Sequence, residues 1–217
     1  MPLTEYAAHK LVQFRAKAVR ESVIGLGHVS QAFSQSIDLY GFLSSNDAVY
    51  GGVCDAMVCF WIAAGGGGGF WQRLRTDGSQ LRQDIAALQA GSGVGNAQIR
   101  AGNAWLQSKQ LALALPCNDD RDLALQEMLD TITAPNPDGA GGTAQPVFRK
   151  LSFSGRAGAH TVGLLIAGNV VFFDPNFGEF EFDSIEKFRE WFKLYWVKSL
   201  YNLGLSGTYC MYSFVHA

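Results

Sequence analysis

One segment of this chain is apolar on every side of the helix that it would form. It follows the short sequence Gly51-Gly52-Val53-Cys54 and runs without a polar residue from Ala56 to Ala64. A helix that lacks a polar face has to be buried on all sides, so the segment predicts a central helix that the rest of the chain covers. The glycine run Gly65–Gly69 ends this helix, because each glycine costs a helix roughly 1 kcal/mol relative to alanine. We interpret the run as a flexible connector.

The hydrophobic pattern changes from helical spacing in the first part of the chain to alternation in the last third. Residues 4–24, 30–40, 54–64, 70–89, 96–115, 119–132 and 184–200 predict helices, and residues 147–154, 159–167, 170–174, 179–182 and 208–215 predict strands. Helices followed by short antiparallel strands are typical of an α+β fold. We expect one domain over residues 1–217, with a possible N-terminal helical extension (1–45), a helical subdomain (46–135) and a sheet subdomain (146–217), separated by a loop over residues 134–146.

Charge and cysteine content exclude several classes of function. The net charge is -2 and Lys and Arg are not clustered, so the chain lacks the basic patch of a nucleic-acid-binding protein. No apolar stretch is long enough to span a membrane, and the polar first ten residues do not resemble a cleavable signal peptide. Four cysteines without a CxxC pair predict neither a zinc site nor a disulfide scaffold, which indicates a reducing compartment. We expect no metal and no cofactor.

Three residues in chain order predict the chemistry of a thiol enzyme. Cys54 opens the apolar helix, His160 begins a strand, and Asp174 ends the next strand. A cysteine at a helix N-terminus has its thiolate stabilised by the helix dipole and by unpaired N–H groups. An imidazole opposite it can hold the thiolate as an ion pair and later protonate a leaving group, and a carboxylate can orient that imidazole.

The turn between the two strands decides whether His160 and Asp174 can cooperate. With a two-residue loop at Gly168-Asn169, Asp174 lies opposite Gly163 and points away from His160. With a three-residue loop that begins at Ala167, Asp174 lies opposite Val162, on the same face as His160 and one diagonal step away. The catalytic interpretation therefore requires the odd-numbered loop.

The motifs around these residues resemble a known family. GGVC before an apolar helix, then AHTVGLLI, then VVFFDPNFGEFEF, are similar to the YopT/AvrPphB-type cysteine peptidases, which are papain-like bacterial effectors. The resemblance implies that Cys54 is the nucleophile, His160 the base and Asp174 its orienting carboxylate. Papain-like enzymes also place an amide side chain shortly before the cysteine to bind the oxyanion, and Asn46 is the candidate here. Gly52 and Gly158 are candidate substrate-binding positions, since glycine lets a substrate backbone approach.

The same resemblance predicts where the protein acts and with which partners. A peptidase of this kind is made in the bacterial cytoplasm, is secreted without a cleavable signal peptide, and cleaves a protein in a host or target cell. A secretion chaperone or an immunity protein is a possible partner.

Two other functions remain open at this stage. Deamidases, transglutaminases and acyltransferases use the same Cys-His-Asp group, because all of them form an acyl-enzyme. A papain-like binding module without catalytic activity is the third possibility.

Overall fold

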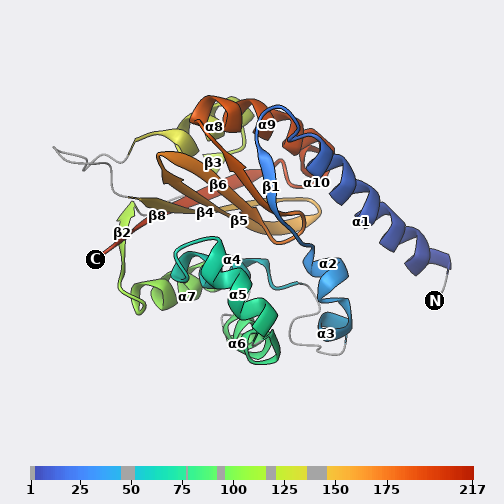
Figure 1. The fold of residues 1–217 in the computed structure, drawn as a ribbon, viewed down its shortest axis with the longest axis horizontal. Helices are drawn as coiled ribbons and strands as arrows, with labels where there is room; N and C mark the ends of the chain where they lie inside the picture. The colour runs from blue at the N-terminus through green and yellow to red at the C-terminus, as the bar shows by residue number, and fades with distance from the viewer. Residues whose placement is uncertain (1–2, 45–51, 77, 92–95, 116–120, 136–145) are drawn as a thin grey trace.

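A single antiparallel sheet lies between two layers of helices in the computed structural model (Figure 1). The structure describes residues 3–44, 52–76, 78–91, 96–115, 121–135 and 146–217. Within these ranges the sheet has eight strands in the order β1-β7-β6-β5-β4-β8-β2, and β3 also pairs with β8. The strands are β1 (His28–Ala32), β2 (Leu111–Leu115), β3 (Arg121–Asp122), β4 (Val147–Gly155), β5 (Gly158–Ala167), β6 (Asn169–Asp174), β7 (Gly178–Phe182) and β8 (Thr208–His216).

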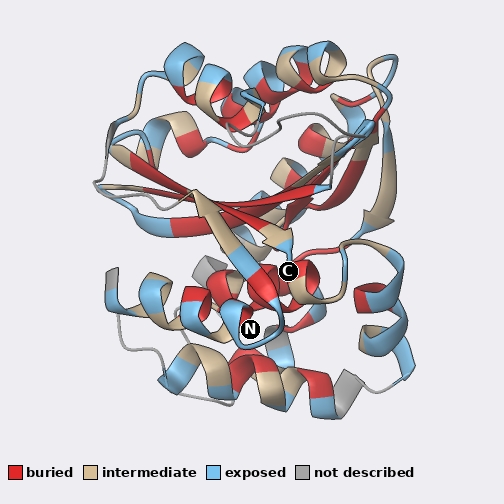
Figure 2. Cartoon of the chain, turned by 90° about the vertical axis from the view of Figure 1, so that its left-hand side faces the viewer, coloured by how far each residue is buried: buried red, intermediate tan, exposed pale blue. Residues whose placement is uncertain are grey.

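Each face of the sheet buries its own hydrophobic core (Figure 2). Helices α1 (Leu3–Glu21), α8 (Leu125–Thr133) and α9 (Ile185–Lys198) cover one face. Four helices cover the other face: α4 (Cys54–Ala63), α5 (Gly68–Thr76), α6 (Gly78–Gly91) and α7 (Asn96–Gln107). Three short helices complete the described residues: α2 (Gln35–Asp38), α3 (Tyr40–Ser44) and α10 (Tyr201–Gly204). The expected α+β class is confirmed, and so are the four strands predicted between residues 147 and 182 and the last strand.

Helix α4 is the buried central helix that its apolar sequence predicts. Residues 55–62 of this helix are all buried. The helix lies close to strand β5 because Gly163 has no side chain: a Cβ there would come within 2.8 Å of the Trp61 ring. This close approach brings the start of α4, where Cys54 lies, toward the strand that carries His160.

The glycine run after α4 forms a turn whose last two residues, Gly68 and Gly69, begin α5; its flexibility stays a prediction. Gly65, Gly66 and Gly67 all adopt positive φ angles, a conformation that residues other than glycine rarely adopt. The turn passes over Glu179, which is 2% exposed and accepts hydrogen bonds from the indole N–H groups of Trp61 (2.6 Å) and Trp71 (3.0 Å). Burying a carboxylate is costly unless donors compensate it, and the indole N–H groups of the helices on either side of the turn supply these donors.

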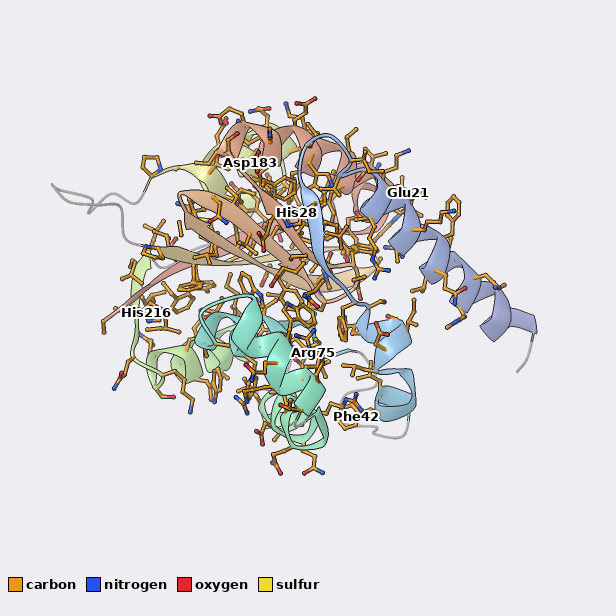
Figure 3. The ribbon with its side chains drawn as sticks, in the orientation of Figure 1. Glu21, His28, Phe42, Arg75, Asp183 and His216 are labelled. Atoms are coloured by element: carbon orange, nitrogen blue, oxygen red, sulfur yellow. The ribbon has the colours of Figure 1, made fainter. Side chains whose placement is uncertain are left out.

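The predicted helix at residues 30–40 is wrong, because the chain there forms an edge strand followed by the single turn of α2. Strand β1 pairs with β7, placing His28 opposite Glu181 and Ala32 opposite Gly178. Arg75 of α5, labelled in Figure 3, donates a 3.2 Å hydrogen bond to Gln31 on this edge. The free edge of β7 supplied backbone partners that the local sequence does not show.

Three other predicted helices differ in extent from those observed. The helix predicted over residues 96–115 ends at Gln107, and strand β2 pairs instead with β8. Gln110 has a φ angle of 64°, so the backbone reverses between the helix and the strand. The segment 70–89 forms two helices, α5 and α6, and the helix predicted from residue 119 begins at Leu125. The division into subdomains and the loop at 136–145 stay predictions, since that loop lies outside the described residues.

Cysteine pairing differs from what a reducing compartment favours. Cys54 and Cys59 are free thiols, whereas Cys210 is disulfide-bonded. Cysteines rarely stay paired in a reducing compartment. The cysteine count of the sequence therefore does not identify the compartment.

Candidate active site

The β5–β6 turn has the odd register that cooperation between His160 and Asp174 requires. Ala167 pairs with Asn169 and Gly163 with Phe173, so the next position places Asp174 opposite Val162, as the three-residue loop predicts. The His160 Nε2 atom lies 2.8 Å from Asp174 Oδ1. Both side chains are buried, at 5% and 0% exposure.

Asp174 is held by donors from three directions. Its Oδ2 accepts hydrogen bonds from the hydroxyls of Tyr195 (2.7 Å) and Tyr201 (3.2 Å). Its Oδ1 accepts a second bond from the backbone N–H of Asn176 (2.7 Å), which belongs to the turn that follows the strand. These neutral donors stabilise a buried carboxylate without neutralising its charge, so Asp174 can act electrostatically on His160. The sequence did not predict either tyrosine as part of the site.

Electrostatics favours the charged form of the His160 imidazole. Burial by itself lowers the pKa of His160, but the charges of Asp174 and of Cys54, together with hydrogen bonds to both, raise it to about 10. Burial and the Asp174 charge also raise the pKa values of Tyr195 and Tyr201 well above 10, so both hydroxyls stay protonated donors.

Cys54 reaches this pair from the opposite layer of the molecule. It is the first residue of α4, it is partly exposed, and it is close enough to His160 to raise the pKa of that imidazole. Both residues line a pocket of about 360 Å³. A thiol at a helix N-terminus, an imidazole in contact with it and an orienting carboxylate together form the arrangement that activates a thiolate nucleophile.

Gln35 is a site residue that the sequence analysis missed. It comes from α2, lies 5% exposed and lines the same pocket. Its Oε1 accepts the backbone N–H of Val53 (3.0 Å), and its Nε2 donates to Asn176 Oδ1 (2.9 Å). The Asn176 amide in turn donates to the Tyr201 hydroxyl (2.9 Å). Gln35 therefore links the residue before the cysteine to the turn after Asp174.

The other predicted site positions have different outcomes. Asn46 lies outside the described residues. Gly52 lines the pocket with a φ angle of 111°, a conformation that favours glycine. Gly158 is the exposed first residue of β5, between two pocket residues, Ala157 and Ala159, and is not itself part of the lining. Its role in substrate binding stays a prediction.

A buried ion pair lies behind Cys54 and His160. Lys150 Nζ is 2.8 Å from Asp55 Oδ1, with the two side chains 0% and 5% exposed. Asp55 follows Cys54 directly and accepts a hydrogen bond (3.3 Å) from Thr161, which follows His160. The thiol of Cys59 lies 3.7 Å from Lys150 Nζ, and burial raises the pKa of this thiol to about 12, so Cys59 is a buried core residue, as predicted.

Comparison with known proteins identifies the family to which this chain belongs. The model of the Peptidase C58 family, the Yersinia/Haemophilus virulence surface antigen family, matches residues 26–209. This chain belongs to the C58 family. The cysteine protease yopT1 of Yersinia enterocolitica serotype O:8 is 28% identical to it over 230 residues, which cover 95% of this chain and 70% of that protein. YopT of Yersinia pestis is 27% identical over 225 residues, with coverages of 91% and 67%.

A solved structure supports the same assignment at the level of the fold. The Pseudomonas avirulence protein AvrPphB is similar with a TM-score of 0.54 and 15% identity, over 79% of this chain and 98% of AvrPphB. The expected papain-like fold is confirmed. This C58 family member is a cysteine peptidase, and its substrates are proteins.

The part of the chain that the structure describes contains neither a cluster of metal ligands nor a membrane-spanning helix. No group of three or more His, Cys, Asp or Glu side chains there could hold a metal ion. No helix in this described part of the chain is long and apolar enough to cross a membrane.

Proposed function

We propose that Cys54, His160 and Asp174 are the catalytic triad of this peptidase. The Cys54 thiolate attacks the carbonyl carbon of a peptide bond, and a C–S bond forms while the carbonyl oxygen takes the negative charge. The His160 imidazolium then gives its proton to the leaving nitrogen as the C–N bond breaks. In the second half, neutral His160 takes a proton from water, the water oxygen attacks the thioester, and the C–S bond breaks to release the new carboxyl group.

The contact of His160 with both partners supports this proposal most strongly. Nε2 is committed to Asp174 at 2.8 Å, so the other ring nitrogen is left for Cys54. A pKa of about 10 keeps His160 protonated at neutral pH, so it can supply the proton that the first half-reaction needs.

The oxyanion needs two hydrogen-bond donors near Cys54. The backbone N–H of Cys54 is one, and Asn46 stays the predicted second. Gln35 is an alternative second donor, because Asn176 uses one of its two amide hydrogens and the side chain lines the same pocket.

We also propose that the protein is made in a bacterial cytoplasm, is secreted and acts in the cytosol of a host or target cell. A secretion chaperone or an immunity protein would bind it before delivery. The similarity to YopT supports this proposal.

The test is N-terminal proteomics of a host-cell lysate incubated with the chain. Wild type should create new protein N-termini that the Cys54→Ala and His160→Ala variants do not create. Cys59→Ala is the matched control, since Cys59 is a buried thiol on the same helix, and it should give the wild-type termini. Conversion of glutamine to glutamate without new termini would instead identify a deamidase. Absence of any Cys54-dependent change would contradict the proposal.

A further inference from the structure

The active-site pocket contains one cationic side chain besides His160. Among the described residues that line it, Arg15 is the only Lys or Arg, and none is Asp or Glu. Arg15 comes from α1 and precedes residues 26–209, so the family match does not account for it. The charge of Asp174 is turned away from the substrate, because that carboxylate is fully buried behind His160.

The Arg15 guanidinium is fixed in place but only partly satisfied. Its Nη2 donates to the backbone oxygen of Ser199 at the end of α9, and its carbon Cζ lies 5.8 Å from the Phe177 ring and 5.7 Å from the Tyr201 ring. Nε is buried without a partner. A guanidinium has five N–H donors, so most of them are not used by the described residues.

We propose that Arg15 is a substrate-binding residue that selects a carboxylate near the scissile bond. This inference rests on the proposed function. Arg15 and His160 both contact the ring of Tyr201: Arg15 Cζ lies 5.7 Å from its centre, and the centre of the His160 ring lies 5.2 Å from it. Because an extended peptide advances about 3.3–3.6 Å per residue, the recognised Asp or Glu lies roughly two to four residues from the cleaved bond. An arginine held between a helix end and two rings binds a carboxylate with little loss of side-chain entropy.

A purely structural role for Arg15 makes a different prediction. Its bond to Ser199 places a positive charge at the C-terminal end of α9, where cations stabilise a helix. If that were its only role, removing Arg15 would reduce cleavage of all substrates alike. A role in selection reduces only the cleavage of acidic substrates.

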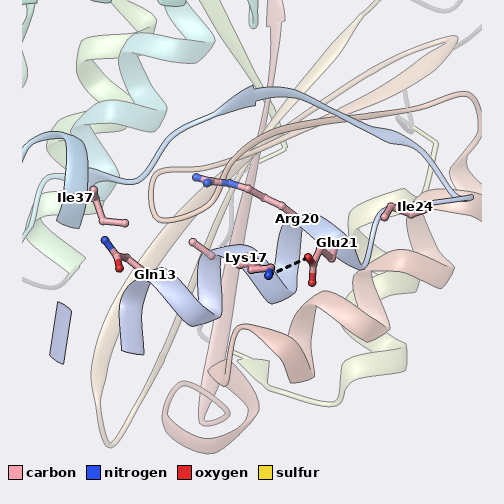
Figure 4. Close-up of a pocket in the computed structure, with 7 residues that line it drawn as sticks. Gln13, Lys17, Arg20, Glu21, Ile24 and Ile37 are labelled. Atoms are coloured by element: carbon pink, nitrogen blue, oxygen red, sulfur yellow. Dashed lines mark ion pairs between the residues drawn. The ribbon is translucent and has the colours of Figure 1, made fainter. Parts of the chain in front are cut away.

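The experiment measures the cleavage specificity of the intact chain on a proteome-derived peptide library. Wild type should cut peptides enriched in Asp or Glu within four residues of the new terminus, and Arg15→Gln should lose this enrichment. The matched control is Lys17→Gln. Lys17 lies on another face of α1, where it pairs with Glu21 at 3.7 Å beside a separate hollow (Figure 4). This control should keep the wild-type specificity.

Two peptides that differ only by Glu or Gln at the selected position provide the quantitative test. We expect wild type to prefer the Glu peptide about tenfold or more in kcat/KM, a typical effect of a charge-assisted hydrogen bond. Arg15→Gln should bring the ratio near one, and Arg15→Lys should keep part of it. Equal loss on both peptides, or a wild type without acidic preference, would overturn the role of Arg15. A wild type that cuts no protein or peptide would instead contradict the proposed function.

Discussion

Replacing Lys150 with methionine tests whether the buried ion pair holds the two catalytic elements together. Lys150 lies on β4, and its Nζ is 2.8 Å from the carboxylate of Asp55, the residue that follows Cys54 in the sequence. The same carboxylate accepts a hydrogen bond from Thr161, the residue that follows His160. The Lys150→Met side chain fills much the same volume but leaves the Asp55 carboxylate buried without its cation. We therefore expect the protein to lose stability and the Cys54–His160 geometry to loosen.

The size of the effect follows from burial and distance. At 2.8 Å and an effective dielectric constant of 20, the attraction between Lys150 and Asp55 is about 6 kcal/mol. The variant no longer has to bury the ammonium group, so the net loss is smaller, about 3–5 kcal/mol for breaking a buried pair. In a chain of this size that corresponds to a fall in Tm of roughly 6–20 °C.

Thermal unfolding and peptidase activity at a temperature where every variant is folded are the two assays. Lys187→Met is the matched control, because Lys187 and Asp183 form an equally short pair (2.6 Å) that is exposed to solvent. The loss of stability in this control should be small, because solvent screens an exposed ion pair. The double variant Lys150→Met with Asp55→Asn should recover most of the stability, since no charge is then left unpaired. A cost below 1 kcal/mol for Lys150→Met, or no recovery in the double variant, would refute the reasoning.

Three other changes test separate parts of the structure. The raised pKa of His160 means that its contribution to stability is complete below about pH 6.5 and is lost as the pH rises toward about 10. Denaturant unfolding of wild type should therefore show a slope of up to about 1.4 kcal/mol per pH unit in this window, and His160→Gln should not show it. Gly163→Ala should cost about 1–3 kcal/mol in chemical unfolding, because its Cβ would lie 2.8 Å from the Trp61 ring, whereas Gly68→Ala has open space and should cost little. Gln35→Leu should lower kcat for peptide cleavage at least tenfold with the chain still folded; an unchanged kcat would show that the bridge to Val53 is dispensable.

The sequence predicted the second half of the fold well because local and long-range signals agree there. Strands β4 to β7 are rich in β-branched and aromatic residues, and short turns connect β4 to β5, β5 to β6 and β6 to β7, so the strands themselves follow from local sequence. The register between β5 and β6 did not, because two loop lengths were open at Gly168-Asn169. The edge strands β1 and β2 do not follow from local sequence either. Leu111–Leu115 reads LALAL, and its leucines and alanines favour a helix as much as a strand. The open edge of β8 decides between the two, and a local pattern does not show that edge.

The site was predictable to the extent that its residues follow recognisable motifs. Cys54, His160 and Asp174 were identified from their positions at the start of a helix and at strand ends, and the register argument gave the condition that brings the last two together. Tyr195 and Gln35 were not identifiable. They come from α9 and α2, far from the triad in sequence, and only the packing of those helices brings their polar groups to the site.

The most direct test of the account is the rate at which iodoacetamide alkylates Cys54, measured by mass spectrometry at pH 6. The account predicts that Cys54 reacts far faster than glutathione under the same conditions, because His160 holds it as a thiolate, and that His160→Ala slows the reaction by about a hundredfold or more. Cys59, buried with a pKa of about 12, should stay unmodified in the same sample. A Cys54 that reacts no faster than glutathione, or at the same rate in wild type and His160→Ala, would contradict the central claim.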